Sequence, residues 1–93
     1  MISTTEVPAL HPQVATRSIE GQALVVLADA GEVAILNESG TLLWEMVDGQ
    51  HTVAELAATL ASEYGLGKVD AEQDTIEFLE TLLELHAIAT ERA

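Results

Sequence analysis

The chain of 93 residues contains no cysteine and very few basic residues. Without cysteine it can form no disulfide, thiolate zinc site or iron–sulfur cluster, and it has no cysteine nucleophile. Three Lys and Arg residues against sixteen Asp and Glu residues give a net charge of −13. The basic residues, Arg17, Lys68 and Arg92, are far apart in the sequence. Because nucleic-acid binding requires Lys and Arg to neutralise phosphates, we expect neither DNA nor RNA to be a ligand.

The sequence also lacks a long apolar run. No stretch reaches the ~18 consecutive apolar residues that indicate a bilayer-spanning helix. The scarcity of Lys and Arg disfavours an anionic membrane surface as a partner. Residues 1–12 have neither the basic start nor the apolar run of a signal peptide. We therefore expect a cytoplasmic protein that does not bind membranes.

Apolar residues are plentiful, since 48% of the chain is hydrophobic. Such a chain can bury enough apolar surface to offset the entropy lost on ordering, and its length suits one hydrophobic core. Residues 1–12 contain two prolines and no periodicity, which predicts a flexible lead-in. We expect one domain at residues 13–89, followed by a short tail at residues 90–93.

Three short segments rich in apolar and β-branched residues open the domain. They are Val14–Ile19, Ala23–Leu27 and Val33–Leu36. Glu20-Gly21-Gln22 and Asp29-Ala30-Gly31 separate them, and each offers a glycine for a positive φ. The pattern predicts a three-stranded antiparallel meander.

After Val33–Leu36, the spacing of the apolar residues changes to the period of a helix. Asn37 can cap a helix that runs through Val47 and stops at Asp48-Gly49. Thr52 and Glu55 have the spacing of a capping box, which predicts the start of a second helix.

This second helix is expected to end at Gly65 or Gly67. Asp70 and Gln73 offer a further capping pair, for a third helix that reaches about His86. Strands followed by helices indicate an α+β fold. We expect a winged helix-turn-helix-like arrangement, with a three-stranded antiparallel sheet followed by three helices.

A pattern spread over most of the domain carries a family resemblance. Its centre is Leu-Asn-Glu-Ser-Gly-Thr-Leu-Leu-Trp-Glu-Met-Val-Asp-Gly at residues 36–49, followed by Thr-Val-Ala-Glu-Leu at residues 52–56. Further matching positions are Leu60, Tyr64-Gly65, Asp70-Ala71-Glu72, Phe78-Leu79-Glu80, Leu82-Leu83 and Ala87-Ile88. Over roughly residues 14–89, the chain resembles the PqqD-like family, whose members hold the leader of a precursor peptide for a separate modifying enzyme.

The resemblance implies a winged-helix protein that binds a peptide and is not itself an enzyme. The leader is expected to add as a strand beside Val33–Leu36 and to lie in a groove against the third helix, a mode known as β-augmentation. The modifying enzyme implied as a partner is a radical-SAM protein or another maturase, and no cofactor is expected. The strands lack the aromatic and basic residues of the family's namesakes, and residues 84–88 lack their tryptophan. The pathway, pyrroloquinoline quinone, lasso peptide or another, therefore stays open.

Laid out at the helical period, the third predicted helix has an acidic arc and a wide apolar arc. The acidic arc consists of Asp70, Asp74, Glu77, Glu80 and Glu84, and the apolar arc of Ile76, Phe78, Leu79, Leu82, Leu83 and Leu85. An apolar arc of about 180° exceeds the ~100° that a core-facing helix needs, so one flank can face a ligand.

Two flanks of this helix are eligible as a groove wall. We favour Phe78 and Leu82, with Thr75 one turn earlier, over Ile76 with Leu83, although the periodicity does not choose between them. The ordinary interpretation is that all of these apolar residues are core.

Two acidic residues complete the candidate site, because Asp74 and Glu77 can border the groove and attract a basic leader. The ordinary interpretation is that these carboxylates form a solvated face. The expected peptide-binding residues are Val33, Ala34, Ile35, Leu36, Asp74, Thr75, Phe78 and Leu82.

Catalytic and metal-binding motifs are missing from the sequence. It has no Gly-rich phosphate loop, no Gly-x-Ser-x-Gly and no HExxH, and His11, His51 and His86 are too far apart to suggest a metal site. The alternative function is a small acidic carrier of the acyl-carrier type, or a winged-helix interaction module that does not act on peptides. Asn37-Glu38-Ser39-Gly40 lacks the Asp-Ser-Leu attachment motif of carriers. The sequence leaves open whether the protein is a monomer or a homodimer.

Overall fold

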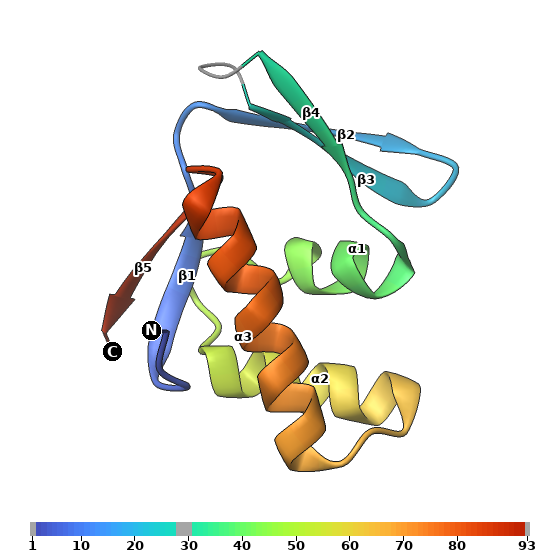
Figure 1. Ribbon diagram of the computed structural model, residues 1–93, viewed down its shortest axis with the longest axis vertical. Helices are drawn as coiled ribbons and strands as arrows, with labels where there is room; N and C mark the ends of the chain where they lie inside the picture. The colour runs from blue at the N-terminus through green and yellow to red at the C-terminus, as the bar shows by residue number, and fades with distance from the viewer. Residues whose placement is uncertain (1, 28–30, 93) are drawn as a thin grey trace.

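The computed structural model describes residues 2–27 and 31–92, and its elements are drawn in Figure 1. In chain order they are β1 (Glu6–Leu10), β2 (Val14–Ile19), β3 (Gln22–Leu27), β4 (Glu32–Ile35), α1 (Glu38–Glu45), α2 (Val53–Tyr64), α3 (Lys68–Glu84) and β5 (Ile88–Arg92). The expected α+β order of three strands and three helices is confirmed, with an additional strand at each end. The carrier alternative, which requires a four-helical fold, is excluded by this architecture.

The three-stranded antiparallel sheet has the order β2-β3-β4. Its first turn is a two-residue hairpin loop with positive φ at both Glu20 (52°) and Gly21 (83°). This type I′ geometry matches the right-handed twist of the strands, and glycine adopts it without a steric cost. The second expected turn, Asp29-Ala30-Gly31, lies outside the described residues except for Gly31, which has a φ of 65°.

The core lies between one face of this sheet and the helices. Ala23, Val25 and Leu27 alternate along β3 and are buried, as the two-residue period of a strand requires. Figure 1 shows the sheet at one end of the molecule, directly over α1. Trp44 of α1 is 4% exposed, and its indole Nε1 donates to Thr16 Oγ1 at 3.1 Å. The tryptophan is therefore a core residue with a satisfied polar group.

The first two helices begin where their capping residues predict. The Asn37 side chain accepts a hydrogen bond from the Gly40 N–H at 2.8 Å. Thr52 and Glu55 form a reciprocal capping box, and the left-handed residue Gly65 ends α2. The first helix ends at Glu45, two residues before the expected Val47.

The third helix begins earlier than its predicted cap. It starts at Lys68 with Gly67 as N-cap and no side-chain cap, so Asp70 lies within the first turn. The predicted pairing of Asp70 with Gln73 as a capping box is therefore wrong. An acidic residue inside the first turn still interacts favourably with the positive end of the helix dipole. Asp is therefore favoured in both positions, and its presence does not distinguish a cap from the first turn.

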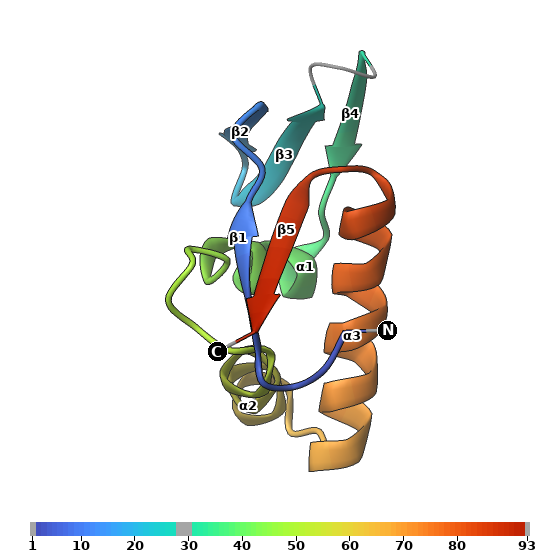
Figure 2. The same ribbon diagram turned by 90° about the vertical axis from the view of Figure 1, so that its left-hand side faces the viewer.

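The expected tail at residues 90–93 is largely part of β5, which reaches Arg92, and the segment expected to be a flexible lead-in, residues 1–12, contains regular structure. The strand β1 lies within this segment and pairs antiparallel with β5, with Glu6 opposite Arg92 and Leu10 opposite Ile88. Figure 2 shows the two strands side by side. Ile2 is 4% exposed and belongs to the core. The pattern was missed because five residues with a proline among them show no clear alternation, and the partner strand is at the opposite end of the sequence.

Within the described residues, no helix combines the length and the apolar character required to cross a membrane.

Candidate functional site

The outer edge of β4 is the first feature of the site. The order of the sheet gives β4 a neighbour on one side only, β3. The Leu36 N–H donates to the Ala23 carbonyl at 2.9 Å, so Leu36 directs its N–H toward β3. Because this direction alternates along a strand, Ala34 also directs its N–H toward β3, whereas Val33 and Ile35 direct theirs outward.

The side chains of β4 alternate in the same way. Ala34 and Leu36 face the core, and Leu36 is 8% exposed. Val33 and Ile35 are 56% and 68% exposed on the opposite face. Edge strands are usually protected by Lys, Pro or a bulge. Strand β4, Glu32–Ile35, contains neither Lys nor Pro, and Glu32 is its one charged residue. This edge is therefore open to pairing with a further strand.

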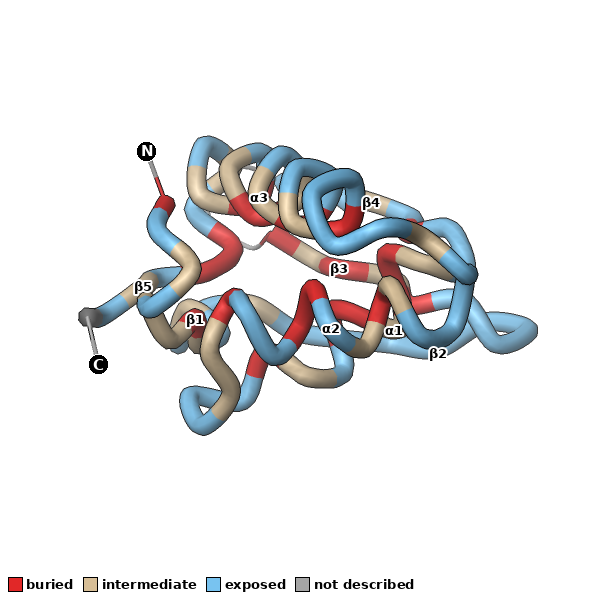
Figure 3. The backbone as a smooth tube through the Cα atoms, turned by 90° about the horizontal axis from the view of Figure 1, so that it is seen from below, coloured by how far each residue is buried: buried red, intermediate tan, exposed pale blue. Residues whose placement is uncertain are grey.

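The helix α3 lies on the same side of the molecule as β4. Seen along the axis of Figure 3, α3 and β4 lie to one side of β3, and α1 and β2 to the other. Of the α3 residues expected to form the groove, Phe78 is half-buried and Asp74 is exposed. Thr75 and Leu82 are 0% and 2% exposed and belong to the core. They can support the site from beneath but offer no surface to a ligand.

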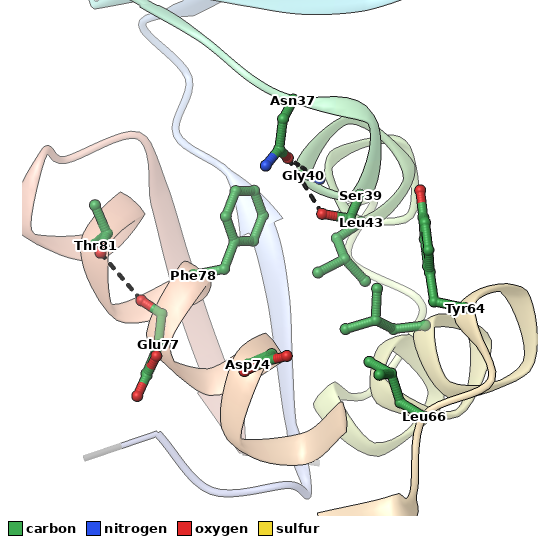
Figure 4. A pocket seen from close by; sticks show the side chains of 11 residues that line it. Asn37, Ser39, Gly40, Leu43, Tyr64, Leu66, Asp74, Glu77, Phe78 and Thr81 are labelled. Atoms are coloured by element: carbon green, nitrogen blue, oxygen red, sulfur yellow. Dashed lines mark hydrogen bonds between the residues drawn. The ribbon is translucent and has the colours of Figure 1, made fainter. Parts of the chain in front are cut away.

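A pocket of about 490 Å³ opens beside Phe78, between α3 and the facing parts of α1 and α2 (Figure 4). Its lining combines apolar side chains with carboxylates, hydroxyls and one amide. The lining residues are Asn37, Ser39, Gly40, Leu43, Leu60, Tyr64, Leu66, Asp74, Glu77, Phe78 and Thr81. This pocket lies on the Phe78 flank of α3, whereas Leu83 of the opposite flank lies near Ile2 and Glu6 on another side.

Gly40 allows Phe78 to approach α1 closely. A Cβ at Gly40 would lie 3.2 Å from Phe78 Cε1 and 3.1 Å from Asn37 Oδ1. Both distances are shorter than ordinary van der Waals contact, so any larger residue would displace the ring or the capping amide. The spacing of Asn37 and Gly40 in the sequence predicted a cap, and it contained no signal that a pocket would form beside it.

Tyr64 forms another wall of the pocket. Burial raises the pKa of its phenol, and the nearby negative charge of Glu38 raises this pKa further. A phenol is neutral at physiological pH, and a hydrogen bond with the Glu38 carboxylate engages this hydroxyl. Three further lining residues, Leu43, Leu60 and Tyr64, entered the sequence analysis only as positions of the family pattern, and Leu66 was not assigned, because their spacing is that of any buried helix face.

The fold and the edge strand together define a winged helix-turn-helix-like domain with an open sheet edge on the same side as its third helix. The family model for coenzyme PQQ synthesis protein D (PqqD) matches residues 20–88. The chain belongs to this family. A comparison with curated proteins found no match.

Several solved structures share the fold. A lasso peptide synthetase B1 complexed with its leader peptide has 24% sequence identity and a TM-score of 0.81, covering 89% of this chain and 98% of that chain. TbiB1 in complex with the TbiA(beta) leader peptide has 18% identity and a TM-score of 0.80, covering 86% and 93%. The PqqD part of Methylobacterium extorquens PqqCD, a stand-alone recognition element for ribosomally synthesised and post-translationally modified peptides, has 22% identity and a TM-score of 0.78, covering 96% and 95%. At these identities the likeness establishes the fold.

Proposed function

We propose that this protein captures the leader of a ribosomally synthesised precursor peptide by strand addition at β4 and presents it to a separate modifying enzyme. The observation that carries the proposal is the outer edge of β4, where Val33 and Ile35 direct their N–H groups away from β3. Family membership supports it, and so do the two leader-bound proteins of the same fold.

The leader supplies the missing fourth strand. The N–H and C=O groups of Val33 and Ile35 exchange hydrogen bonds with leader residues that lie directly opposite them. Each such bond contributes about 0.5–1.5 kcal/mol net, which anchors a peptide without regard to its sequence. Selectivity comes from side chains, because leader residues alternate between the exposed face of Val33 and Ile35 and the face toward α3.

The modifying enzyme acts on the core of the precursor while this protein holds the leader. A radical-SAM enzyme or another maturase fits this role. The adaptor alone is expected to leave the mass of the peptide unchanged, and mass spectrometry of a purified mixture without the enzyme tests this expectation.

Proline substitutions in β4 separate folding from binding. Ala34→Pro removes an N–H that bonds β3 and leaves a Val25 carbonyl unpaired, at a cost of about 1–3 kcal/mol or more, so we expect a destabilised protein. Ile35→Pro removes an outward N–H, so the protein is expected to stay folded and to bind the leader about tenfold more weakly or worse. Circular dichroism melts and calorimetric titration with a synthetic leader peptide that binds the wild type measure both effects.

Ile35→Ala is the matched control, because it shortens the exposed side chain and retains the N–H. This variant is expected to bind more tightly than Ile35→Pro. A folded Ile35→Pro protein with wild-type affinity would exclude strand addition at this edge.

A further inference from the structure

The pocket beside Phe78 lies close to the end of β4. The strand ends at Ile35, and Asn37, two residues further, already lines the pocket. A peptide that pairs with β4 and continues past Ile35 therefore arrives at this pocket. All the strand pairs among the described residues are antiparallel. If the peptide also pairs antiparallel with β4, its residues beyond Ile35 are those that precede its paired segment.

We infer that this pocket is a second subsite for the leader, which takes one large apolar side chain and pairs an adjacent Lys or Arg with Asp74 and Glu77. The inference rests on the proposed function, since the peptide reaches the pocket by way of the β4 edge. It assigns the recognised chemistry to the part of the leader that is N-terminal to its strand.

The residues at the base and sides of the pocket determine the preference for a large apolar side chain. Leu43 and Leu60 are buried at its base, Leu66 is half-buried, and the Phe78 ring and the Tyr64 ring lie on opposite sides (Figure 4). A volume of about 490 Å³ accommodates a leucine-sized or aromatic side chain. Burying such a side chain contributes about 1.5–3 kcal/mol, which makes it the main source of affinity at this subsite.

The carboxylates at the rim of the pocket, Asp74 and Glu77, determine the preference for an adjacent Lys or Arg. Asp74 and Glu77 lie one turn apart on α3, and neither forms an ion pair with another described residue. The two rim carboxylates thus have no cationic partner in the described part of the chain. Both are exposed, so pairing with a Lys or Arg adds selectivity and a faster encounter more than affinity.

A displayed library of short random peptides, selected in parallel on the wild type and on variants, tests the inference. Wild type is expected to enrich peptides that carry a large apolar residue and a neighbouring Lys or Arg before an extended segment. The double variant Asp74→Asn/Glu77→Gln is expected to lose about twofold to fivefold of the enrichment for Lys and Arg and to keep the apolar preference. Asp70→Asn/Glu84→Gln changes the net charge equally on exposed α3 positions outside the pocket and is expected to select as wild type does.

A second pair of variants tests the preference for a large apolar side chain. Thr81→Trp places a bulky ring at the pocket wall and is expected to reduce the apolar preference, whereas Val69→Trp, at an α3 position that is 67% exposed, leaves it unchanged. If the Asp74→Asn/Glu77→Gln variant keeps the preference for Lys and Arg and Thr81→Trp keeps the apolar preference, the pocket is not a subsite. That result would not contradict strand addition at β4. If wild type enriches no peptides, or if the enriched peptides bind Ile35→Pro as well as wild type, the proposed function itself fails.

Discussion

At the scale of single residues, the two buried threonines have opposite hydrogen-bonding situations. Thr41 Oγ1 accepts from the Ala23 N–H at 2.9 Å and also donates to the Leu36 carbonyl at 3.4 Å. It thereby connects α1 to the sheet where β4 ends. Thr75 is 0% exposed, and its Oγ1 has no hydrogen-bond partner among the described residues. An unpaired buried hydroxyl is destabilising, whereas a paired one stabilises the contact that it makes.

Valine substitution distinguishes the two residues, because it replaces the hydroxyl with a methyl group of similar size. Thr41→Val leaves the buried Ala23 N–H unpaired and is expected to lower the free energy of unfolding by about 1–3 kcal/mol. Thr75→Val removes an unpaired group and is expected to be neutral or to stabilise the protein by about 1 kcal/mol. Urea denaturation measures both, and an equal loss in the two variants would contradict this account.

The pair of His51 and Asp48 makes stability depend on pH. The hydrogen bond from the ring to Asp48, at 3.0 Å, raises the pKa of His51. The pKa of Asp48 is lowered, first by the Gln50 N–H and then by His51. Protonated His51 is therefore favoured in the folded protein. Its contribution is complete below the unfolded pKa of 6.5 and is lost as the pH rises through the raised folded value.

We expect His51→Gln to lower stability at about pH 5 and to have less effect at about pH 8. The effect is small because both side chains are exposed to solvent. Urea denaturation of both proteins at the two pH values measures it. A larger loss at the higher pH would reverse the predicted sign.

At the scale of elements, local chemistry made the central part of the fold predictable. The β2-β3 turn, the Asn37 cap and the capping box at Thr52 each depend on residues close together in sequence, and all are confirmed. The β1-β5 pair was not predictable in this way, because its register depends on contacts between the two ends of the chain. The start of α3 was misplaced because Gly67 caps it without a side-chain hydrogen bond, and a glycine there is equally compatible with the end of the preceding helix.

The candidate site was predictable to a similar extent. The edge strand and Phe78 followed from the family resemblance and the helical period, and Phe78 lines the pocket. Periodicity could not separate the exposed flank of α3 from the buried one, so Thr75 and Leu82 were included although they are core residues. The α1 and α2 walls of the pocket depend on how three helices pack, which no local pattern encodes.

The N-terminal segment provides a test of the β1-β5 pair. Ile2 is 4% exposed in the core, whereas Leu10 in the same segment is 40% exposed. Ile2→Ala is expected to lower the free energy of unfolding by about 2–4 kcal/mol, and Leu10→Ala by clearly less. Thermal or urea denaturation measures the difference. Two variants as stable as wild type would indicate that residues 1–12 are the flexible lead-in that the sequence suggested.

At the scale of the whole molecule, the fold and the charge point to different ligands. Winged helix-turn-helix-like domains are a common architecture for DNA binding, and a fold by itself does not determine function. Here the net charge is −13, and the exposed face of α3 carries carboxylates such as Asp70, Asp74 and Glu77. A duplex approaching this face meets repulsion where a DNA-binding protein would supply Lys and Arg.

We therefore expect no saturable binding of mixed-sequence duplex DNA at physiological ionic strength. Peptides with Lys or Arg beside an apolar residue should behave in the opposite way. Their association rates should rise as salt is lowered, because the electrostatic field of the whole molecule attracts them before contact.

Fluorescence anisotropy with labelled DNA, and stopped-flow mixing with a peptide selected on the wild type, measure the two behaviours over one salt series. Screening acts on both ligands with opposite sign: added salt slows the encounter with the peptide and weakens the repulsion of DNA. Salt-sensitive DNA binding at micromolar protein, or peptide association that is indifferent to salt, would show that the acidic surface does not select the ligand.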